Sequence, residues 1–441
     1  MSKTNPQRCL IISSRLPMHS AGLGNDIKTA LQNKGIEVDF LTRYKDSSSD
    51  KSVIGIRPMP SDQILGISKN SFFYKAFRKL FGLLVPKKTK YIINNGIEIK
   101  YIDERDPDYH VDEILSCIKK KYDLIITLFW QDMINSTTLK AIYDNQKCPI
   151  MIYSPDMAPM TGGCFYFGNC SRYMYGCGQC PGLGSNSVND QSNINIRVKR
   201  ENYESSNIAF LGNTWMLDHF RVSYLNGSCR LFNVGLVLDE ETFIPYDDYC
   251  KQHIRNSLNI KDDDFLIMIR STPDIRKGND DIHKGLQRLI SQYQGLKNIK
   301  VITVGDSYFS KLSKNNNLAV IDFGQVQLDQ LIDLYNISDV FISASIDDAG
   351  PSMINQSIMC GTPVISYNTG VAPDVIRNDV SGYLIPKGDY IQMSEKLKYL
   401  LTKTQEEYSA LRASTRKIAY KNNSKESFVN TIISAYNEML S

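Results

Sequence analysis

One segment near the C-terminal end, SASIDDAGPSMINQSIMCGTPVISYNTGVAPDVI from Ser343 to Ile376, constrains the fold of this chain most strongly. An apolar run at 340–342 precedes it and predicts a buried strand. After a polar loop, Pro351 suits the first residue of a helix. Gly361 would end that helix near residue 360, before a second strand over 363–367. This order of strand, loop, helix and strand is typical of a parallel α/β sheet.

The start of this predicted helix is a candidate anion-binding site. It faces the carboxyl edge of the sheet, where free backbone N–H groups and the helix dipole favour negative charge. Gly350 and Ser352 border the helix start and are candidate ligand-binding residues, whereas Pro351 has no N–H to donate. Asp348 lies just before the helix, and Gln356 lies two turns along it.

Length and composition narrow the class of protein. A chain of 441 residues predicts two domains of roughly 200 residues each. A hydrophobic content of 42% with 22% charged residues is that of a globular protein, and a net charge of +4 is too small to indicate nucleic-acid binding. No apolar run reaches the roughly eighteen residues of a membrane span, and the start MSKTNPQRCLIISS lacks the apolar core of a signal peptide. We therefore expect a cytoplasmic location, with the ten cysteines as thiols or metal ligands.

The N-terminal part predicts a second parallel α/β domain. A strand at 9–14, a glycine loop, a helix at 26–33 and a strand at 36–41 follow one another. The loop Gly22-Leu23-Gly24 lacks the full dinucleotide fingerprint and does not indicate a nicotinamide cofactor. It is either a ligand-binding loop or a tight turn.

Four cysteines lie close together in the segment Ser154–Ser185. Cys164, Cys170, Cys177 and Cys180 are spaced C-x5-C-x6-C-x2-C, which suggests a tetrahedral zinc site. Four thiolates leave no open coordination position, so such a zinc ion would be structural, and it could supply on the order of 10 kcal/mol of ordering energy. The alternative is four small buried thiols.

The segment 72–90, FFYKAFRKLFGLLVPKKTK, predicts an amphipathic basic helix. One face carries Phe73, Phe77, Leu80 and Leu84, and lysines and arginines supply positive charge around it. Such a helix can lie in a membrane surface, or it can be an ordinary core-facing helix with a solvated basic side.

Two of these segments resemble one family, the retaining GT-B glycosyltransferases of family 4 (group 1 sugar transferases). Asp348 stands at the first acid of the family's E-x7-E segment, Gln356 at its second Glu, and Cys360-Gly361-Thr362-Pro363-Val364-Ile365 is close to the family's C-G-T-P-V-V. The segment from Ser154 resembles the D-M-x-P-x-T-G-G-C…C-G-x-C-P sequence of one bacterial subgroup, with Asp156 matching and Pro155 in place of the subgroup's His.

This resemblance implies the GT-B fold: two Rossmann-like parallel-sheet domains that face each other across a cleft. Residues 1–240 would form the acceptor-side domain with a cysteine-rich insertion at 160–185. Residues 241–422 would bind the nucleotide sugar, and a helix at 423–441 would cross back onto the first domain.

The resemblance also implies the roles of individual residues. Arg270, at the end of a predicted strand, and the lysine of a Lys-Gly pair would clasp the donor diphosphate. Two pairs qualify, Lys277-Gly278 and Lys284-Gly285, and the distance from Lys284 to the predicted strand at 300–304 suits one helix, which favours Lys284. Asp348 would accept hydrogen bonds from the reacting sugar, and Gln356 would contact the ribose.

Further family positions complete the expected site. Val326, in a Gly-x-Val turn, would hold the nucleotide base, while Gly22 and Gly24 would line the floor beneath the donor phosphates. Asp156 is a further candidate catalytic residue.

The function implied by the resemblance is transfer of a sugar, with retention and without a catalytic metal, from a UDP- or GDP-sugar to a glycan. The acceptor would be a lipid-linked glycan in the synthesis of a bacterial surface polysaccharide (O-antigen, capsule or exopolysaccharide), at the cytoplasmic face of the inner membrane. The alternative is a non-catalytic GT-B subunit that binds a nucleotide or a partner within a glycan-assembly complex.

Overall fold

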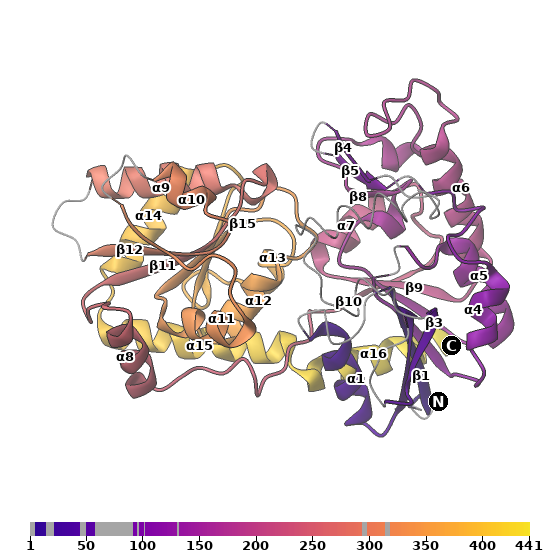
Figure 1. Ribbon diagram of the computed structural model, residues 1–441, viewed down its shortest axis with the longest axis horizontal. Coiled ribbons are helices and arrows are strands. Elements are labelled where there is room, and N and C mark those ends of the chain that lie inside the picture. Colours follow the sequence, from indigo (N-terminus) through magenta and orange to yellow (C-terminus); the bar gives the residue numbers. More distant parts are fainter. Residues whose placement is uncertain are drawn as a thin grey trace, which may run out of the picture. The chain divides into compact units, whose positions relative to one another are not determined.

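The computed structural model describes residues 5–14, 22–44, 50–57, 91–94, 97–100, 102–129, 132–292, 298–313 and 318–441. The chain divides into two compact units. Unit 1 comprises Met1–Gly212, Leu217–Phe232 and Ile432–Ser441, and unit 2 comprises Asn213–Met216 and Asn233–Thr431. A large, mainly buried β-sheet lies at the centre of each unit (Figure 1).

The main sheet of unit 1 has seven strands in the order β10-β9-β7-β6-β1-β2-β3. β1 pairs in parallel with both β2 and β6, with Cys9 opposite Val38 and Leu124. The strand order reverses between β1 and β6, so their carboxyl ends form the topological switch point of this sheet. The strands are β1 (Arg8–Ser13), β2 (Glu37–Tyr44), β3 (Val53–Arg57), β6 (Leu124–Thr127), β7 (Ile150–Tyr153), β9 (Ile208–Gly212) and β10 (Arg230–Asn233).

Helices of unit 1 follow the strands as a parallel sheet requires, because each crossover must carry the chain back to the start of the next strand. The first begins earlier than the predicted 26–33, because Gly22 takes a left-handed conformation (φ 90°) as its N-cap. The helices are α1 (Leu23–Gln32), α4 (Val111–Cys117), α5 (Ser136–Gln146), α6 (Gln191–Glu204) and α7 (Thr214–Val222), with short 3₁₀ turns η2 (Ala158–Met160) and η3 (Arg172–Tyr175).

A second, antiparallel sheet in unit 1 was not predicted from the sequence. It has the order β4-β5-β8, and its strands are β4 (Tyr91–Asn94), β5 (Ile97–Lys100) and β8 (Cys164–Tyr166). Ile99 pairs with Cys164, so the cysteine-rich segment begins as a strand of this sheet.

The predicted basic helix at 72–90 lies outside the described residues. Of the helices within the described ranges, none combines the length and apolar character needed to cross a membrane.

The sheet of unit 2 has six strands in the order β13-β12-β11-β14-β15-β16. Numbered along the chain this is 3-2-1-4-5-6, the order of a doubly wound nucleotide-binding sheet. All five neighbouring pairs are parallel. The strands are β11 (Phe265–Ser271), β12 (Ile299–Gly305), β13 (Ala319–Asp322), β14 (Val340–Ser343), β15 (Val364–Tyr367) and β16 (Gly382–Ile385).

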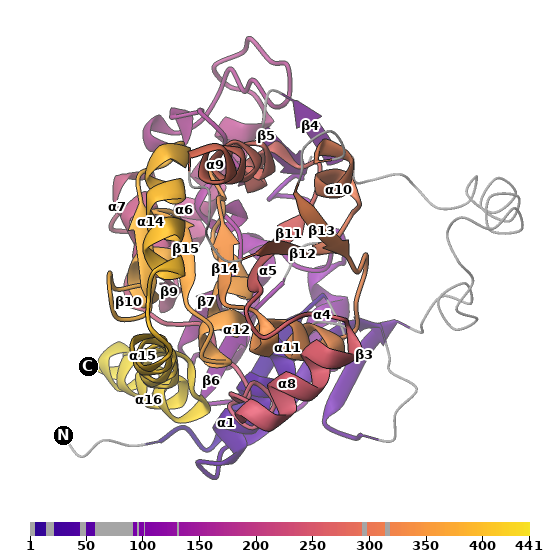
Figure 2. The same cartoon turned by 90° about the vertical axis from the view of Figure 1, so that its left-hand side faces the viewer.

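Helices cover both faces of the unit 2 sheet (Figures 1 and 2). Alternate residues of β11 show why: Leu266 and Met268 belong to the apolar core beneath α11 and α12, whereas Ile267 belongs to the core beneath α9 and α14. The helices are α8 (Asp248–Ser257), α9 (Asn279–Gln292), α10 (Tyr308–Leu312), α11 (Leu328–Ile337), α12 (Ser352–Met359), α13 (Ala372–Val375), α14 (Tyr390–Leu401) and α15 (Gln405–Asn423), with a 3₁₀ turn η4 (Ile275–Lys277). The last helix, α16 (Lys425–Leu440), begins in unit 2 and continues into unit 1 at Ile432.

Candidate functional site

The switch point of the unit 2 sheet lies between β11 and β14. These strands are parallel neighbours, with Ile269 opposite Ile342, so the loops that follow them leave the same edge side by side. The loop after β11 runs from 272 to 278, and the loop after β14 runs from 344 to 351. In doubly wound sheets this edge is where ligands bind.

The two loops pack closely against each other. The backbone N–H of Ile346 donates to the carbonyl of Arg276 at 2.8 Å. Gly278 has φ 64°, and a Cβ at this position would lie 2.1 Å from the carbonyl oxygen of Ala344. Only glycine satisfies both conditions, so Gly278 lets the first loop rest directly on the second.

This packing brings Lys277 to Asp348. The ammonium group of Lys277 forms an ion pair with the Asp348 carboxylate, and the two side chains are only 16% and 5% exposed. The other carboxylate oxygen of Asp348 accepts from the backbone N–H of Gly350 at 3.1 Å. A basic and an acidic side chain therefore meet at the start of α12.

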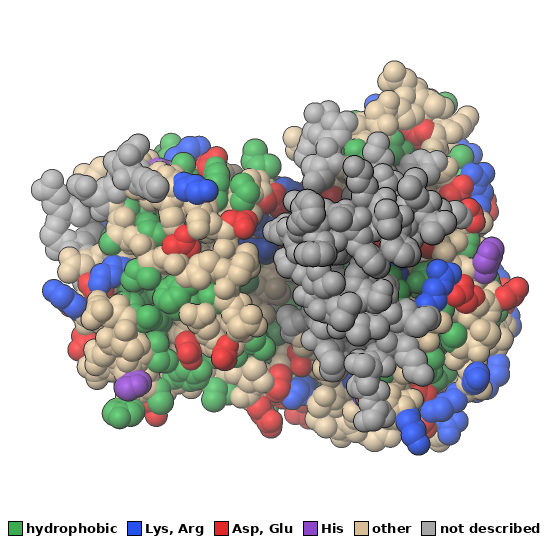
Figure 3. Space-filling view, in the orientation of Figure 1, with side chains coloured by type: hydrophobic (Ala, Val, Ile, Leu, Met, Phe, Trp, Pro, Cys, Tyr) green, Lys and Arg blue, Asp and Glu red, His purple; other side chains and the backbone are tan. Residues whose placement is uncertain are grey.

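A small cavity of about 40 Å³ opens at this point. Its polar lining includes Arg270 and Lys277, together with Ser345 and Ser352 from the second loop and the start of α12. Two cations and a helix N-terminus at one sheet edge form a local environment suited to phosphate groups. Elsewhere on unit 2, on the face seen in Figure 3, basic and acidic side chains are interspersed.

Lys284, favoured from the sequence over the other Lys-Gly pair, does not lie at this sheet edge in the structure. α9 begins at Asn279, directly after Gly278, and not at the second pair. Lys284 therefore lies within the helix, where its side chain is 54% exposed and pairs with Asp281 at 3.2 Å. The sequence does carry the signal that was missed, because Gly278 is followed by Asn-Asp-Asp, residue types favoured at a helix start.

Gln356 is buried in unit 2, with 5% of its surface exposed. Its side-chain oxygen accepts a hydrogen bond from the hydroxyl of Tyr335, on α11, at 3.0 Å. Burial raises the pKa of Tyr335 well above its ordinary value, so this hydroxyl remains a donor. The partly buried Val326 packs against the same apolar core, after β13.

The remaining expected site residues belong to unit 1. Gly22 caps α1, and Gly24 is buried in its first turn. Asp156 follows β7, is 8% exposed, and accepts from the backbone N–H of Ala158 at 2.9 Å. The carboxylate of Asp156 therefore holds the turn that leads into η2.

The four cysteines of the segment Ser154–Ser185 lie near one another. The Cys164 thiol donates a hydrogen bond to the sulfur of Cys180, and this contact lowers the pKa of Cys180 to about 6. The charges of Cys170 and Cys177 also act on Cys164. Within the ranges that the structure describes, however, no group of three or more His, Cys, Asp or Glu side chains is arranged to hold a metal ion. The structural zinc remains a prediction from the cysteine spacing.

Metal analysis of the purified chain tests this prediction. Elemental mass spectrometry should find about one zinc per chain, and Cys177→Ser should lose it, because a tetrahedral site needs four ligands. Cys250→Ser is the matched control, since Cys250 is exposed on α8. A wild-type zinc content near zero would identify the four cysteines as buried thiols.

Comparisons with known proteins agree with the sheet topology. Residues 251–430, within unit 2, match the family model "Glycosyl transferases group 1". A stretch of 177 residues, 39% of this chain, is 27% identical to the sulfoquinovosyl transferase SQD2 of Arabidopsis thaliana. The match covers 33% of that protein, so the chain aligns with about a third of the length of this curated relative.

Solved structures resemble the chain over almost its whole length. A glycosyltransferase from Rickettsia africae has a TM-score of 0.63 at 15% identity, covering 99% of this chain and 100% of that one. Sucrose-phosphate synthase from Thermosynechococcus elongatus has a TM-score of 0.61 at 15% identity, covering 98% of this chain and 99% of that one. Anabaena HepE, solved with UDP-glucose, has a TM-score of 0.59 at 13% identity, covering 98% of this chain and 99% of that one. The chain thus has the two-sheet α/β fold of the GT-B glycosyltransferases, and its residues 251–430 match their group 1 family.

Proposed function

We propose that this protein is a retaining glycosyltransferase that binds a UDP- or GDP-sugar at the switch point of unit 2. The observation that carries the proposal is the meeting of Arg270, Lys277 and Asp348 at the carboxyl ends of β11 and β14. The acceptor is a glycan, and we infer a lipid-linked glycan of a bacterial surface polysaccharide. The match of unit 2 to group 1 glycosyltransferases and the fold shared with HepE, solved with UDP-glucose, support this assignment.

The chemistry follows from the charges at the switch point. As the bond between the anomeric carbon and the diphosphate breaks, negative charge develops on the leaving oxygen. Arg270 and Lys277 stabilise that charge, together with the backbone donors at the start of α12, without a metal ion. Asp348 accepts hydrogen bonds from the sugar hydroxyls. The acceptor hydroxyl oxygen bonds to the anomeric carbon on the face that the diphosphate leaves, and its proton passes to the departing diphosphate oxygen. Bound phosphate would draw Lys277 away from Asp348 and free this carboxylate for the sugar.

The test is a screen of UDP- and GDP-sugars for release of the nucleoside diphosphate, followed by titration calorimetry of UDP and GDP. We expect slow hydrolysis of one donor without acceptor, and binding of its nucleotide. Binding without any turnover, with an acceptor mixture present, would support the non-catalytic alternative. Neither binding nor turnover would contradict the proposal.

Gln356→Glu should tighten binding of the cognate nucleotide several-fold. In the proposed complex this side chain contacts the ribose, and a carboxylate makes a charge-assisted hydrogen bond about 1 kcal/mol stronger than that of an amide. Because this contact exists in the ground state and the transition state alike, KM should fall while kcat stays unchanged. Steady-state kinetics check the result, and a raised KM would show that Gln356 does not face the nucleotide.

A further inference from the structure

A polar cavity of about 290 Å³ lies in unit 1, separate from the residues proposed to bind the donor. Its walls come from Lys100, from residues 102–108, from Asp132 to Asn135 after β6, and from the turn around Gly163. β6 is one of the two strands at the switch point of the unit 1 sheet, so the cavity lies where such a sheet offers a ligand site. Nothing in the proposed donor chemistry uses it.

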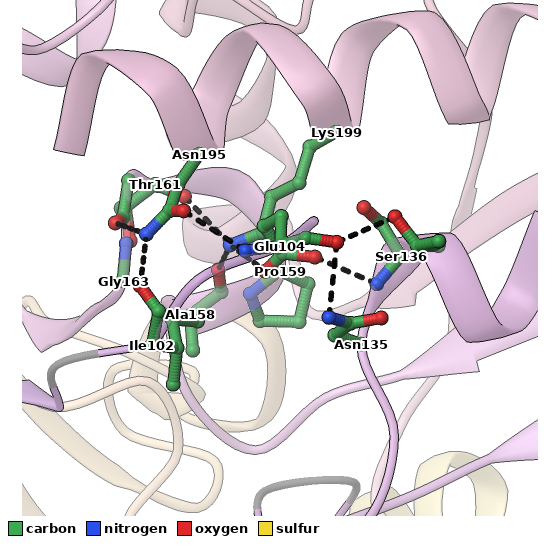
Figure 4. A network of polar contacts seen from close by, with 12 residues as sticks. Ile102, Glu104, Asn135, Ser136, Ala158, Pro159, Thr161, Gly163, Asn195 and Lys199 are labelled. Atoms are coloured by element: carbon green, nitrogen blue, oxygen red, sulfur yellow. Dashed lines mark hydrogen bonds and ion pairs between the residues drawn. The ribbon is translucent and has the colours of Figure 1, made fainter. Parts of the chain in front are cut away.

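The floor of the cavity is a buried polar network (Figure 4). Lys199 extends from α6 to Glu104 at 3.3 Å, and both side chains are 1% exposed. Lys199 also donates to the carbonyls of Ala158 and Thr161 at 2.7 and 2.8 Å. The second oxygen of Glu104 accepts from the backbone N–H of Ser136, at the start of α5, at 2.7 Å. Each charge has several partners, so the network fixes the floor of the cavity in place.

The turn Thr161-Gly162-Gly163-Cys164 contributes Gly163 to the cavity lining. A Cβ at Gly162 would lie 2.3 Å from the carbonyl oxygen of Ser192, on α6, so this turn packs directly on the helix backbone. Gly163 has φ 131° and would place a Cβ 3.2 Å from the carbonyl of Lys100. The two glycines thus allow the turn to close between α6 and the end of β5. Part of the segment that resembles the bacterial subgroup therefore borders this cavity.

The cations that line the cavity are already paired with carboxylates. The lining has five acidic side chains, Asp103, Glu104, Asp106, Asp108 and Asp132, and two basic ones, Lys100 and Lys199. Lys199 is neutralised by Glu104, and the buried Lys100 pairs with both Asp108 and Asp132. Two arginines outside the lining add positive charge, since Arg105 pairs with Asp103 and Arg43 with Asp132. Each of these cations already has a carboxylate partner, so the cavity offers little to a phosphate group. A metal ion is also disfavoured, because no group of three such ligands in the described part of the chain is arranged to hold one.

A neutral ligand with many hydroxyl groups suits a cavity that has many carboxylate acceptors and whose cations are already paired. Carboxylates that are already paired can still accept hydrogen bonds through their remaining lone pairs. Ile102, Ile134 and Phe165 add an apolar part to the same lining. A volume of about 290 Å³ is at the small end of the roughly 300–1,000 Å³ found for ligand sites, and it suits one ring rather than an oligosaccharide.

We propose that this cavity binds a single neutral sugar ring, with Asp132 and Asp108 accepting from its hydroxyls and Phe165 against its apolar face. Assigning that ring to the acceptor glycan rests on the proposed function, whereas the binding of the ring does not. The inference specifies the acceptor chemistry: the part that enters unit 1 is an unphosphorylated and uncharged sugar.

Saturation-transfer NMR on the full chain, without nucleotide, tests the proposal. The probes are the methyl α-glycosides of glucose, galactose, mannose and N-acetylglucosamine, with glucose 6-phosphate as the anionic comparison. We expect at least one glycoside to bind in the millimolar range, and glucose 6-phosphate to bind at least tenfold more weakly. Asp132→Asn should weaken glycoside binding about tenfold, because a charge-assisted acceptor is lost.

Asp262→Asn, an exposed carboxylate of unit 2, is the matched control and should bind as the wild type does. Asp108→Asn, which changes the other carboxylate proposed to accept from the ring, replaces Asp132→Asn if the latter does not fold. Absence of glycoside binding, equal binding by the wild type and the Asp132 variant, or tighter binding of glucose 6-phosphate would each overturn the proposal. The binding experiment contains no donor, so it is independent of the turnover assay. Glycoside binding in a protein without donor turnover would support this inference and refute the proposed function. Donor turnover in a protein that binds no glycoside would support the proposed function and refute this inference.

Discussion

Replacing Lys277 with methionine should lower the rate of donor turnover about a hundredfold, with the protein still folded. The ammonium group lies at the switch point of unit 2, in contact with Asp348, where the diphosphate is proposed to bind. Removing one preorganised group that stabilises a leaving anion costs about 2.7 kcal/mol or more in the transition state. Lys277→Met also leaves the Asp348 carboxylate facing the phosphates without its cation, which adds repulsion. Nucleoside diphosphate release from the cognate sugar measures the effect.

Lys284→Met is the matched control, because it removes the same group seven residues further along the chain, from an exposed position of α9. This variant should keep the wild-type rate. Loss of activity in Lys284→Met with a fully active Lys277→Met would show that the second Lys-Gly pair holds the donor. If neither variant changes the rate, the diphosphate does not bind between β11 and β14.

Lys199→Met should destabilise unit 1 by about 3–5 kcal/mol. The change leaves the Glu104 carboxylate buried without its cation, and it removes the donor of two carbonyl hydrogen bonds. Breaking a buried ion pair from one side costs this much because an uncompensated charge remains. Urea denaturation followed by circular dichroism measures the free energy of unfolding.

Two comparisons separate the buried pair from a general effect of losing a lysine. Lys140→Met removes a partly exposed pair with Asp144 on α5 and should cost less than about 0.5 kcal/mol. Glu104→Gln combined with Lys199→Met should recover part of the lost stability, because no unpaired charge is left in the core. A double variant that is less stable than Lys199→Met would contradict this account of the network.

The parallel sheets could be predicted because their signals are local. The apolar run before Ser343, the proline near the helix start and Gly361 at its end together predict β14, α12 and β15 within one or two residues. The C-terminal helix, predicted at 423–441, is α16 with the bounds Lys425–Leu440. In each case the spacing of apolar residues along the sequence indicates a buried strand or an amphipathic helix directly.

Contacts between distant residues could not be predicted in this way. Glu104 and Lys199 look like ordinary surface charges in the sequence, and only their pairing across unit 1 allows both to be buried. β5 pairs with β4 on one side and with β8 on the other, so its register depends on the cysteine-rich segment as well as on its own pattern. The start of α9 directly after Gly278 rests on the left-handed conformation of this glycine and its contact with Ala344, in addition to the local Asn-Asp-Asp signal.

Hydrogen–deuterium exchange with and without the cognate nucleotide tests the central claim most directly, because it locates the bound diphosphate in the full chain. The nucleotide is UDP or GDP, whichever binds in calorimetry, at a concentration that saturates the protein. We predict that protection will be strongest in peptides covering residues 270–280 and 343–356, which carry the two loops at the switch point of unit 2. Measured binding with unchanged exchange in both of these segments would contradict the assignment of the donor site.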